Sequence, residues 1–359
     1  MNTSLRILTS LLLACAALAE EPFKLDMKRA QELYGRDQRG EKLSDEDRAW
    51  LEKAKVAVRG QSQPAAPSEP WTKHLTPLTE LGTGTYKGED GGLYGGGKNE
   101  PPAQHLAAAM KLAKEIQPLD AEGKPSANGR IGLLSVGMSN TTQEFSTWVT
   151  RMRTDKDMSP KVALVDGAQG ARTSIRWADA NSDVWPELDR RLQSAGITVK
   201  QIQVIWMKQA EGGPMRMGEF PQHARTLQEN LVKSLVNLHA KFPNVKLAYL
   251  SSRIYAGNAT TPLNPKPYAY ESAFTMRWLI ADQIAGKPAM KDLPLLQWGP
   301  YLWADGETPR KADGLTYTKA DFERDGTHPS TTGRVKVADQ LSAFFKTNAT
   351  TKPWFLAKP

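Results

Sequence analysis

Four short polar segments of this 359-residue sequence together contain the residue types that acyl transfer needs. The segment VGMSN carries Ser139, and the segment DGTHPS near the C-terminus carries Asp325 and His328. A serine hydroxyl becomes a good nucleophile when a base takes its proton and a third group holds that base in the right tautomer. His328 can be the base, and Asp325 can reach its imidazole because it lies three residues earlier in a turn. The spacing therefore predicts a catalytic triad of Ser139, His328 and Asp325.

The other two segments carry groups that could hold a developing oxyanion. The segment DGAQGARTSIRW, 166–177, contains Gly170, and the segment MKQAEGG, 207–213, contains Gln209. Preorganised donors stabilise the transition state of acyl transfer, and the loss of one typically costs about 2.7–4 kcal/mol. We expect the backbone N–H groups of Ser139 and Gly170 and the side-chain amide of Gln209 to form this oxyanion hole.

Each of these segments also has a purely structural interpretation, which the sequence alone leaves open. Ser139 stands where a helix cap is expected, and Thr141 with Glu144 has the pattern of a capping box at the start of a helix. Gly170 fits a tight turn. The segment DGTHPS fits the entry to a last helix, because a proline is favoured in the first turn. In the catalytic interpretation, by contrast, Thr141 and Glu144 cap the helix, which leaves Ser139 on the turn before it.

The elements that must position these residues alternate along the chain. Short, continuous apolar runs predict strands buried on both faces, and amphipathic stretches between them predict helices. The predicted strands are 130–137, 161–166, 202–207 and 245–251, and the predicted helices are 103–116, 141–153, 183–195, 222–241 and 268–285. Strands separated by helices indicate the α/β class, a three-layer α/β/α sandwich with a mostly parallel sheet. Ligands bind such sheets at the carboxyl ends of the strands, where three of the four segments lie.

The four segments in this order resemble the SGNH hydrolases, also called the GDSL superfamily, over about residues 128–347. The closer resemblance is to carbohydrate O-acetylesterases, the sialate O-acetylesterase-like and acetylxylan-esterase-like proteins. Their nucleophile turn reads Gly-Gln-Ser-Asn, which GMSN resembles. Their later blocks read Gly-Gly-Thr-Ser-Ile-x-x-Trp and Trp-x-Gln-Gly-Glu, which GARTSIRW and WMKQAEGG resemble.

This resemblance implies a flavodoxin-like α/β/α fold and the same site residues. Carried over position by position, it makes Ser139 the nucleophile, Asp325 and His328 the rest of the triad, and Gly170 and Gln209 oxyanion donors.

The sequence departs from the family pattern at three places. Met138 replaces a polar residue, Ala171 replaces the second glycine of its block, and one residue is inserted between Trp206 and Gln209. The insertion leaves Lys208 as an alternative to Gln209 in the oxyanion hole.

Three further residues are candidates for substrate binding. Arg172, Arg253 and Tyr255 follow the second and fourth predicted strands, so they could line the same cleft. The arginines could hold a sugar carboxylate or sulfate through charge-assisted hydrogen bonds. The alternative is that they form local surface ion pairs.

The N-terminal third has a different organisation. Residues 1–19 have the pattern of an export signal, with Arg6, an apolar run and a small-residue cleavage site before Glu20. We expect a secreted or periplasmic protein, and the alternative is a lipoprotein anchored at Cys15. A helical arm is predicted over 20–60, with Ser44 and Asp47 as a capping pair, and a proline- and glycine-rich linker and surface loop over 61–102. The hydrolase domain is predicted over 103–350.

Composition excludes several other classes of protein. The formal net charge is +8, but no block of lysine and arginine indicates nucleic-acid binding. With one cysteine and scattered histidines, we expect no metal and no cofactor. No segment after the signal is apolar enough to span a membrane. The predicted function is an exported serine esterase that removes O-acetyl or other small acyl groups from a carbohydrate or polysaccharide, either neutral or anionic. The alternatives are a lipase or lysophospholipase on the same fold and a non-catalytic carbohydrate-binding or surface protein.

Overall fold

The computed structural model describes residues 74–357, residues 43–61 and a few positions before them, namely 23–26, 29–30, 32–33 and 36. The chain divides into two compact units, Met1–Ala66 and Pro67–Pro359. The predicted export signal, Cys15 and the proline-rich part of the predicted linker lie outside the described residues.

The larger unit is built on a parallel sheet of five strands in the order β4-β3-β5-β6-β7. The strands are β3 (Ile131–Gly137), β4 (Val162–Asp166), β5 (Ile202–Lys208), β6 (Leu247–Leu250) and β7 (Leu295–Trp298). Numbered along the chain, this order is 2-1-3-4-5, the flavodoxin-like arrangement. The order reverses between β3 and β5, so a ligand crevice is expected beyond the carboxyl ends of these two strands.

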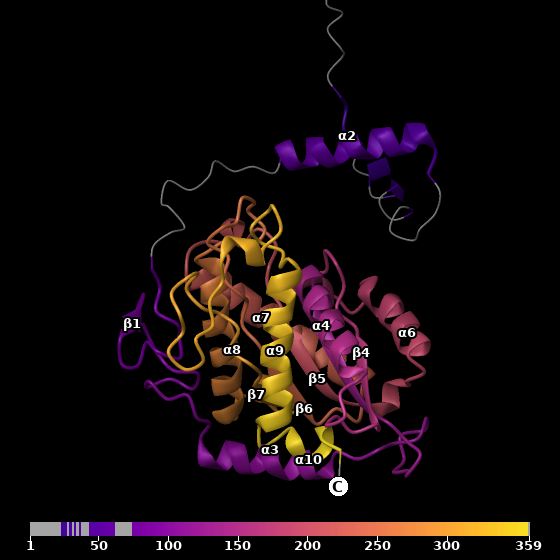
Figure 1. Cartoon of the computed structure of the whole chain (residues 1–359), viewed down its shortest axis with the longest axis vertical. Coiled ribbons are helices and arrows are strands. Elements are labelled where there is room, and N and C mark those ends of the chain that lie inside the picture. The colour runs from indigo at the N-terminus through magenta and orange to yellow at the C-terminus, as the bar shows by residue number, and fades with distance from the viewer. Residues whose placement is uncertain are drawn as a thin grey trace, which may run out of the picture. The chain divides into compact units, whose positions relative to one another are not determined.

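Helices cover both faces of the sheet, as Figure 1 shows. The helices of this unit are α3 (Ala103–Glu115), α4 (Ser139–Met152), α5 (Ser174–Ala178), α6 (Val184–Ser194), α7 (Gln222–Lys241), α8 (Tyr268–Ile284), α9 (Thr331–Thr347) and α10 (Lys352–Phe355). Side chains alternate along β3, so that Leu133 packs in a cluster with α3, α4 and α9, whereas Leu134 packs in a cluster with α6, α7 and α8. The predicted three-layer α/β/α sandwich is therefore confirmed.

The four predicted strands and five predicted helices are present, and every end lies within two residues of its predicted position. Strand β7 was not predicted, because its run PLLQW is short and lies between prolines. The core also extends past residue 350, since Trp354 and Phe355 on α10 are buried against Phe345 of α9. Figure 1 shows α10 beside α3 near the C-terminus.

The glycine-rich segment before α3 is anchored to the larger unit. It contains a short antiparallel hairpin, β1 (Thr85–Tyr86) and β2 (Glu89–Asp90). Arg277 on α8 donates to both the carboxylate and the carbonyl of Asp90, and the indole of Trp298 donates to the Leu93 carbonyl at 2.7 Å. Leu78 in this segment is fully buried. These contacts bind the segment to the α8 side of the sheet.

The smaller unit contains α2 (Asp45–Gln61). The predicted capping pair is confirmed, because the backbone N–H of Asp47 donates to the Ser44 hydroxyl at 3.1 Å and that hydroxyl donates to the Asp47 carboxylate at 2.9 Å. Leu33, Leu43 and Leu51 form its buried cluster. Across the described residues of both units, no helix is both long and apolar enough to cross a membrane.

Candidate active site

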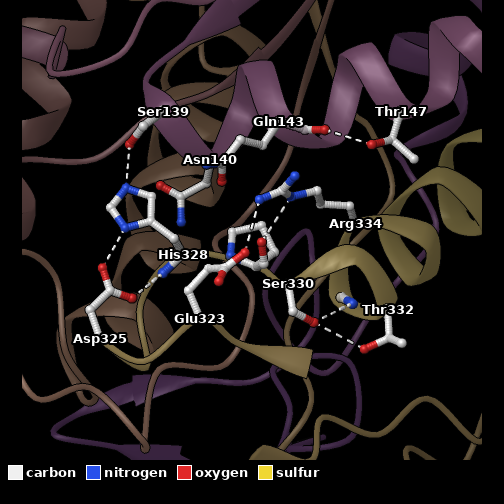
Figure 2. A network of polar contacts seen from close by, with 12 residues as sticks. Ser139, Asn140, Gln143, Thr147, Glu323, Asp325, His328, Ser330, Thr332 and Arg334 are labelled. Carbon is white, nitrogen blue, oxygen red and sulfur yellow. Dashed lines mark hydrogen bonds and ion pairs between the residues drawn. The ribbon is translucent and has the colours of Figure 1, made fainter. Parts of the chain in front are cut away.

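The three predicted triad residues lie in one hydrogen-bonded line (Figure 2). The Oγ of Ser139 is 2.7 Å from Nε2 of His328, and Nδ1 of His328 is 2.5 Å from Oδ2 of Asp325. A carboxylate beside Nδ1 favours the tautomer with its proton on that nitrogen, which leaves Nε2 to accept the Ser139 proton. This arrangement matches a nucleophile, a base and an orienting acid.

A tight turn between β3 and α4 sets the position of Ser139. A Cβ on Gly137 would lie 2.4 Å from the Lys208 carbonyl oxygen and 2.3 Å from the Thr141 hydroxyl, so a larger residue does not fit. Helix α4 begins at Ser139 itself, and Met138, with φ of −114°, is its N-cap residue without a side-chain cap. Met138 is buried, so an apolar residue suits this place.

The predicted capping box of Thr141 and Glu144 is wrong, and so is the expectation that Ser139 precedes the helix. The Thr141 hydroxyl donates to the Lys208 carbonyl at 2.7 Å, and the Glu144 carboxylate binds Nζ of Lys208. Both side chains point to β5 and not to the first turn of α4. The pattern that resembles a cap instead fixes α4, the helix that begins at Ser139, to the neighbouring strand β5.

Asp325 and His328 are held by a compact turn before α9. Oδ1 of Asp325 accepts from the backbone N–H groups of Thr327 and His328, both at 2.9 Å, while its Oδ2 faces the imidazole. The side-chain amide of Asn140 on α4 donates to the Thr327 carbonyl at 2.9 Å. This bond ties the turn to the helix of Ser139, a role that sequence analysis did not assign to the buried Asn140.

The same turn keeps Asp325 ionised. Burial alone would raise the pKa of its carboxyl, but hydrogen bonds from the His328 side chain and from two backbone N–H groups outweigh burial and lower the pKa to about 2. The ordinary value is 3.8. A carboxyl with a lowered pKa in the folded state stabilises the fold fully above its ordinary pKa, and the contribution is lost as the pH falls toward the folded-state value.

We therefore expect the stability difference between the wild-type protein and Asp325→Asn to depend on pH in acid. From pH 5 to pH 3, the difference in unfolding free energy should shrink by about 0.5 kcal/mol, because the full pKa shift would give about 1 kcal/mol and partial exposure of the carboxylate reduces it. Urea denaturation at the two pH values measures it. A difference that stays constant, or grows toward pH 3, would contradict the assigned pKa.

The loops with the predicted oxyanion donors lie at the same edge of the sheet. The backbone N–H of Gln169 donates to the Gly137 carbonyl at 3.0 Å, so Gly170 directly follows a residue bound to the end of β3. Gln209 directly follows β5 and is fully buried, and its amide nitrogen donates to the Arg172 carbonyl at 3.3 Å. A primary amide has two N–H groups, so one remains for a second acceptor. Ala171, with φ of 59°, holds a left-handed conformation that suits the glycine of the family pattern.

Lys208, the alternative oxyanion donor, is placed elsewhere. Its side chain is fully buried and its Nζ binds both carboxylate oxygens of Glu144, which is also fully buried. Burial lowers the pKa of Lys208, and the Glu144 charge only partly opposes this shift. Both Lys208 and Gln209 are fully buried, but the ammonium group is bound to a counter-ion whereas the Gln209 amide keeps a second N–H group, so Gln209 is the better candidate.

The predicted substrate-binding residues are not placed alike. Arg172 forms a 2.6 Å ion pair with Asp183 at the surface, which agrees with the local-pair alternative. The prediction that Arg253 lines an open cleft is wrong for this structure, because Arg253 is only 1% exposed. Tyr255 is half-buried and its ring lies against Trp303 and Phe322. Of the three, Tyr255 and Arg172 retain exposed atoms, and neither contacts the triad through a described hydrogen bond.

Sequence analysis also missed a group of buried charges behind the site. Arg253 lies close enough to Glu144 and Asp325 for their charges to raise its pKa, although burial lowers it overall to about 10. The Nε and Nη1 atoms of Arg253 are buried without a hydrogen-bond partner among the described residues. The one sequence signal is Lys208 itself, the single charged residue of a strand that is buried along its whole length. The described residues contain no cluster of three or more histidine, cysteine or acidic side chains that could hold a metal ion.

Comparisons with known proteins add little to this geometry. No family model and no curated protein matches the sequence. A provisionally assigned acylhydrolase from Bacteroides fragilis is 14% identical with a TM-score of 0.37, covering 69% of this chain and 99% of its own. A protein from Arabidopsis thaliana is 18% identical with a TM-score of 0.30, covering 56% and 67%. A carbohydrate esterase with divergent catalytic and non-catalytic binding functions is 12% identical with a TM-score of 0.35, covering 64% and 72%. At these values the similarity carries no argument about activity.

Proposed function

We propose that the protein is a serine esterase of the SGNH type. The observation that carries the proposal is the line of hydrogen bonds from Ser139 through His328 to Asp325, at 2.7 and 2.5 Å. The site also lies beyond β3 and β5, where a flavodoxin-like sheet provides its ligand crevice. The non-catalytic alternative expects Ser139 and His328 to lie beyond hydrogen-bond reach, so the 2.7 Å distance favours the enzyme.

The mechanism uses only side chains, backbone N–H groups and water. His328 takes the Ser139 proton as the hydroxyl oxygen attacks the ester carbonyl, and Asp325 stabilises the imidazolium that forms. The oxyanion is held by the N–H groups of Ser139 and Gly170 and by the Gln209 amide. His328 then protonates the leaving alcohol, and a water activated by the same base hydrolyses the acyl-enzyme.

We further propose that the substrate is a carbohydrate carrying O-acetyl or other small acyl esters. The support is the resemblance of GMSN, GARTSIRW and WMKQAEGG to the carbohydrate O-acetylesterase blocks. A lipase would need an apolar surface gathered around the site. The exposed large hydrophobic residues of the described chain come from four different helices and one loop. They are Ile175, Val236, Leu263, Ile284 and Val335. Export through the signal at residues 1–19, or anchoring at Cys15, belongs to the same proposal and suits a polysaccharide substrate outside the cytoplasm.

A serine-directed fluorophosphonate probe tests the nucleophile. We expect one covalent adduct per chain, located by peptide mass spectrometry on Ser139. The His328→Gln variant, which lacks the base, should be labelled about 10²–10⁴-fold more slowly, because general-base catalysis accelerates a reaction by about that factor. No adduct, or an adduct on another serine, would overturn the proposed function.

A further inference from the structure

The two loops that carry the proposed oxyanion donors are bound to each other. We call residues 167–173 the Gly170 loop and residues 209–213 the Gln209 loop. The backbone N–H of Ser174, just after the first loop, donates to the Ala210 carbonyl at 3.2 Å. The Gln209 side chain donates to the Arg172 carbonyl at 3.3 Å. Each loop follows a different strand, so these bonds set the spacing of the two donors across the crevice.

Glu211 lies at the centre of this contact. One of its carboxylate oxygens, Oε1, accepts from the Ser174 hydroxyl and from the Asn230 side chain, the latter at 2.8 Å. Ser174 begins α5 directly after the Gly170 loop, and Asn230 lies on α7. The backbone carbonyl of Glu211 accepts a hydrogen bond from the Asn264 side chain at 3.4 Å. A single oxygen atom therefore joins the Gln209 loop, the end of the Gly170 loop and a core helix.

This carboxyl group is unusual because it is buried without a cation. Glu211 is 2% exposed, and no ion pair involves it within the described part of the chain. Burial raises its pKa, and the hydrogen bonds from Ser174 and Asn230 only partly offset the shift. Burying an acidic group costs free energy, and an apolar residue of similar size would avoid that cost. The presence of a buried carboxyl group at Glu211 is therefore better explained by the loop geometry that its hydrogen bonds maintain than by a contribution to the free energy of folding.

We propose that Glu211 is a positioning residue that fixes the spacing of the Gly170 N–H and the Gln209 amide in the oxyanion hole. It acts through Ser174 and through the loop that it belongs to, and it does not touch the substrate. The proposal rests on the proposed esterase function. It follows that the acceptor oxygen matters more than the negative charge.

A pair of variants separates these two properties. Glu211→Gln keeps an acceptor at Oε1 and places an NH₂ group at Oε2, which has no partner among the described residues. Glu211→Leu keeps the approximate volume but removes the acceptor. We expect Glu211→Leu to reduce kcat for a small acetyl ester by about 10–100-fold with KM changed less than threefold, because removal of a whole oxyanion donor costs about 10²–10³. Glu211→Gln should keep kcat within about threefold of the wild type, since hydrogen bonding to Oε1 is retained.

Rates are expressed per active site, titrated with the fluorophosphonate probe at completion, so that unfolded protein does not count. Gln228→Leu is the matched control. It removes a buried polar side chain from α7 that binds Arg225 and Asp282, away from both loops, and should leave kcat per site unchanged. Normal kcat per site in Glu211→Leu would overturn the positioning role, as would an equal loss in Glu211→Gln. If Ser139 of the wild-type protein takes no label, the esterase proposal itself fails, which is a separate outcome.

Discussion

Ser139→Ala should reduce the hydrolysis of 4-nitrophenyl acetate by about 10⁴–10⁶-fold, the range seen when a triad nucleophile is removed. The reason is that no other hydroxyl in the described chain bonds to His328, so the base loses the group that it activates. Oxyanion donors and binding alone leave a residual rate of about 10³–10⁴ over water. The variant should fold normally, because the lost hydroxyl bonds only to His328 within the described chain. Initial rates and the urea midpoint of the purified protein measure both expectations.

The matched control is Ser146→Ala. Ser146 lies on the same helix and is exposed to solvent, and its hydroxyl bonds only to the Gln143 carbonyl within α4. It should keep wild-type activity. An Ser139→Ala protein that hydrolyses the ester at the wild-type rate would remove Ser139 from the mechanism, whatever the probe labels.

The geometry of the proposed triad could be predicted because its members follow strand ends and turns whose chemistry is local. Ser139 and His328 are 189 residues apart, yet a parallel sheet brings every strand's carboxyl end to one edge. The Asp325 turn needs only three residues to reach the imidazole. Apolar runs predict which strands are buried, and the flavodoxin-like strand order then determines which loops meet.

What the sequence could not reveal is the partner of a side chain when two partners are chemically acceptable. By sequence alone, Thr141 and Glu144 fit a capping box. In the structure they bind Lys208 on the neighbouring strand, Thr141 through the Lys208 carbonyl and Glu144 through its buried ammonium group. Arg253 looks like a substrate ligand because it follows β6, and only packing shows that it points into the interior. Both errors concern contacts between residues distant in sequence.

The buried ion pair of Lys208 and Glu144 should contribute strongly to the free energy of unfolding, and removal of Glu144 should cost more than removal of Lys208. Lys208 and Glu144 are both fully buried, and Arg253 lies near enough for attraction to Glu144 and for repulsion of Lys208. Breaking a buried ion pair by removing one partner costs about 3–5 kcal/mol, because the other charge is left uncompensated. Lys208→Met should fall at the low end of that range, since Glu144 still faces Arg253.

Glu144→Gln should be the more damaging change, because it leaves two buried cations, Lys208 and Arg253, near each other without this carboxylate. We expect a loss of about 4–5 kcal/mol of unfolding free energy, and the double variant Glu144→Gln with Lys208→Met should lose about 2 kcal/mol less than the sum of the two single changes. Urea denaturation of the four proteins gives this coupling directly.

A surface pair provides the control for this comparison. Lys246 and Glu115 form a 3.1 Å ion pair with side chains 31% and 43% exposed, and Glu115→Gln should cost less than about 1 kcal/mol. If Glu144→Gln costs no more than Glu115→Gln, the charges behind the triad are screened by water and do not hold α4 on β5. If Lys208→Met proves the costlier single change, Arg253 does not share the Glu144 charge. We expect the loss of unfolding free energy to be largest for Glu144→Gln, smaller for Lys208→Met and far smaller for Glu115→Gln. This order follows only if α4 is held on β5 by one carboxylate that attracts two cations.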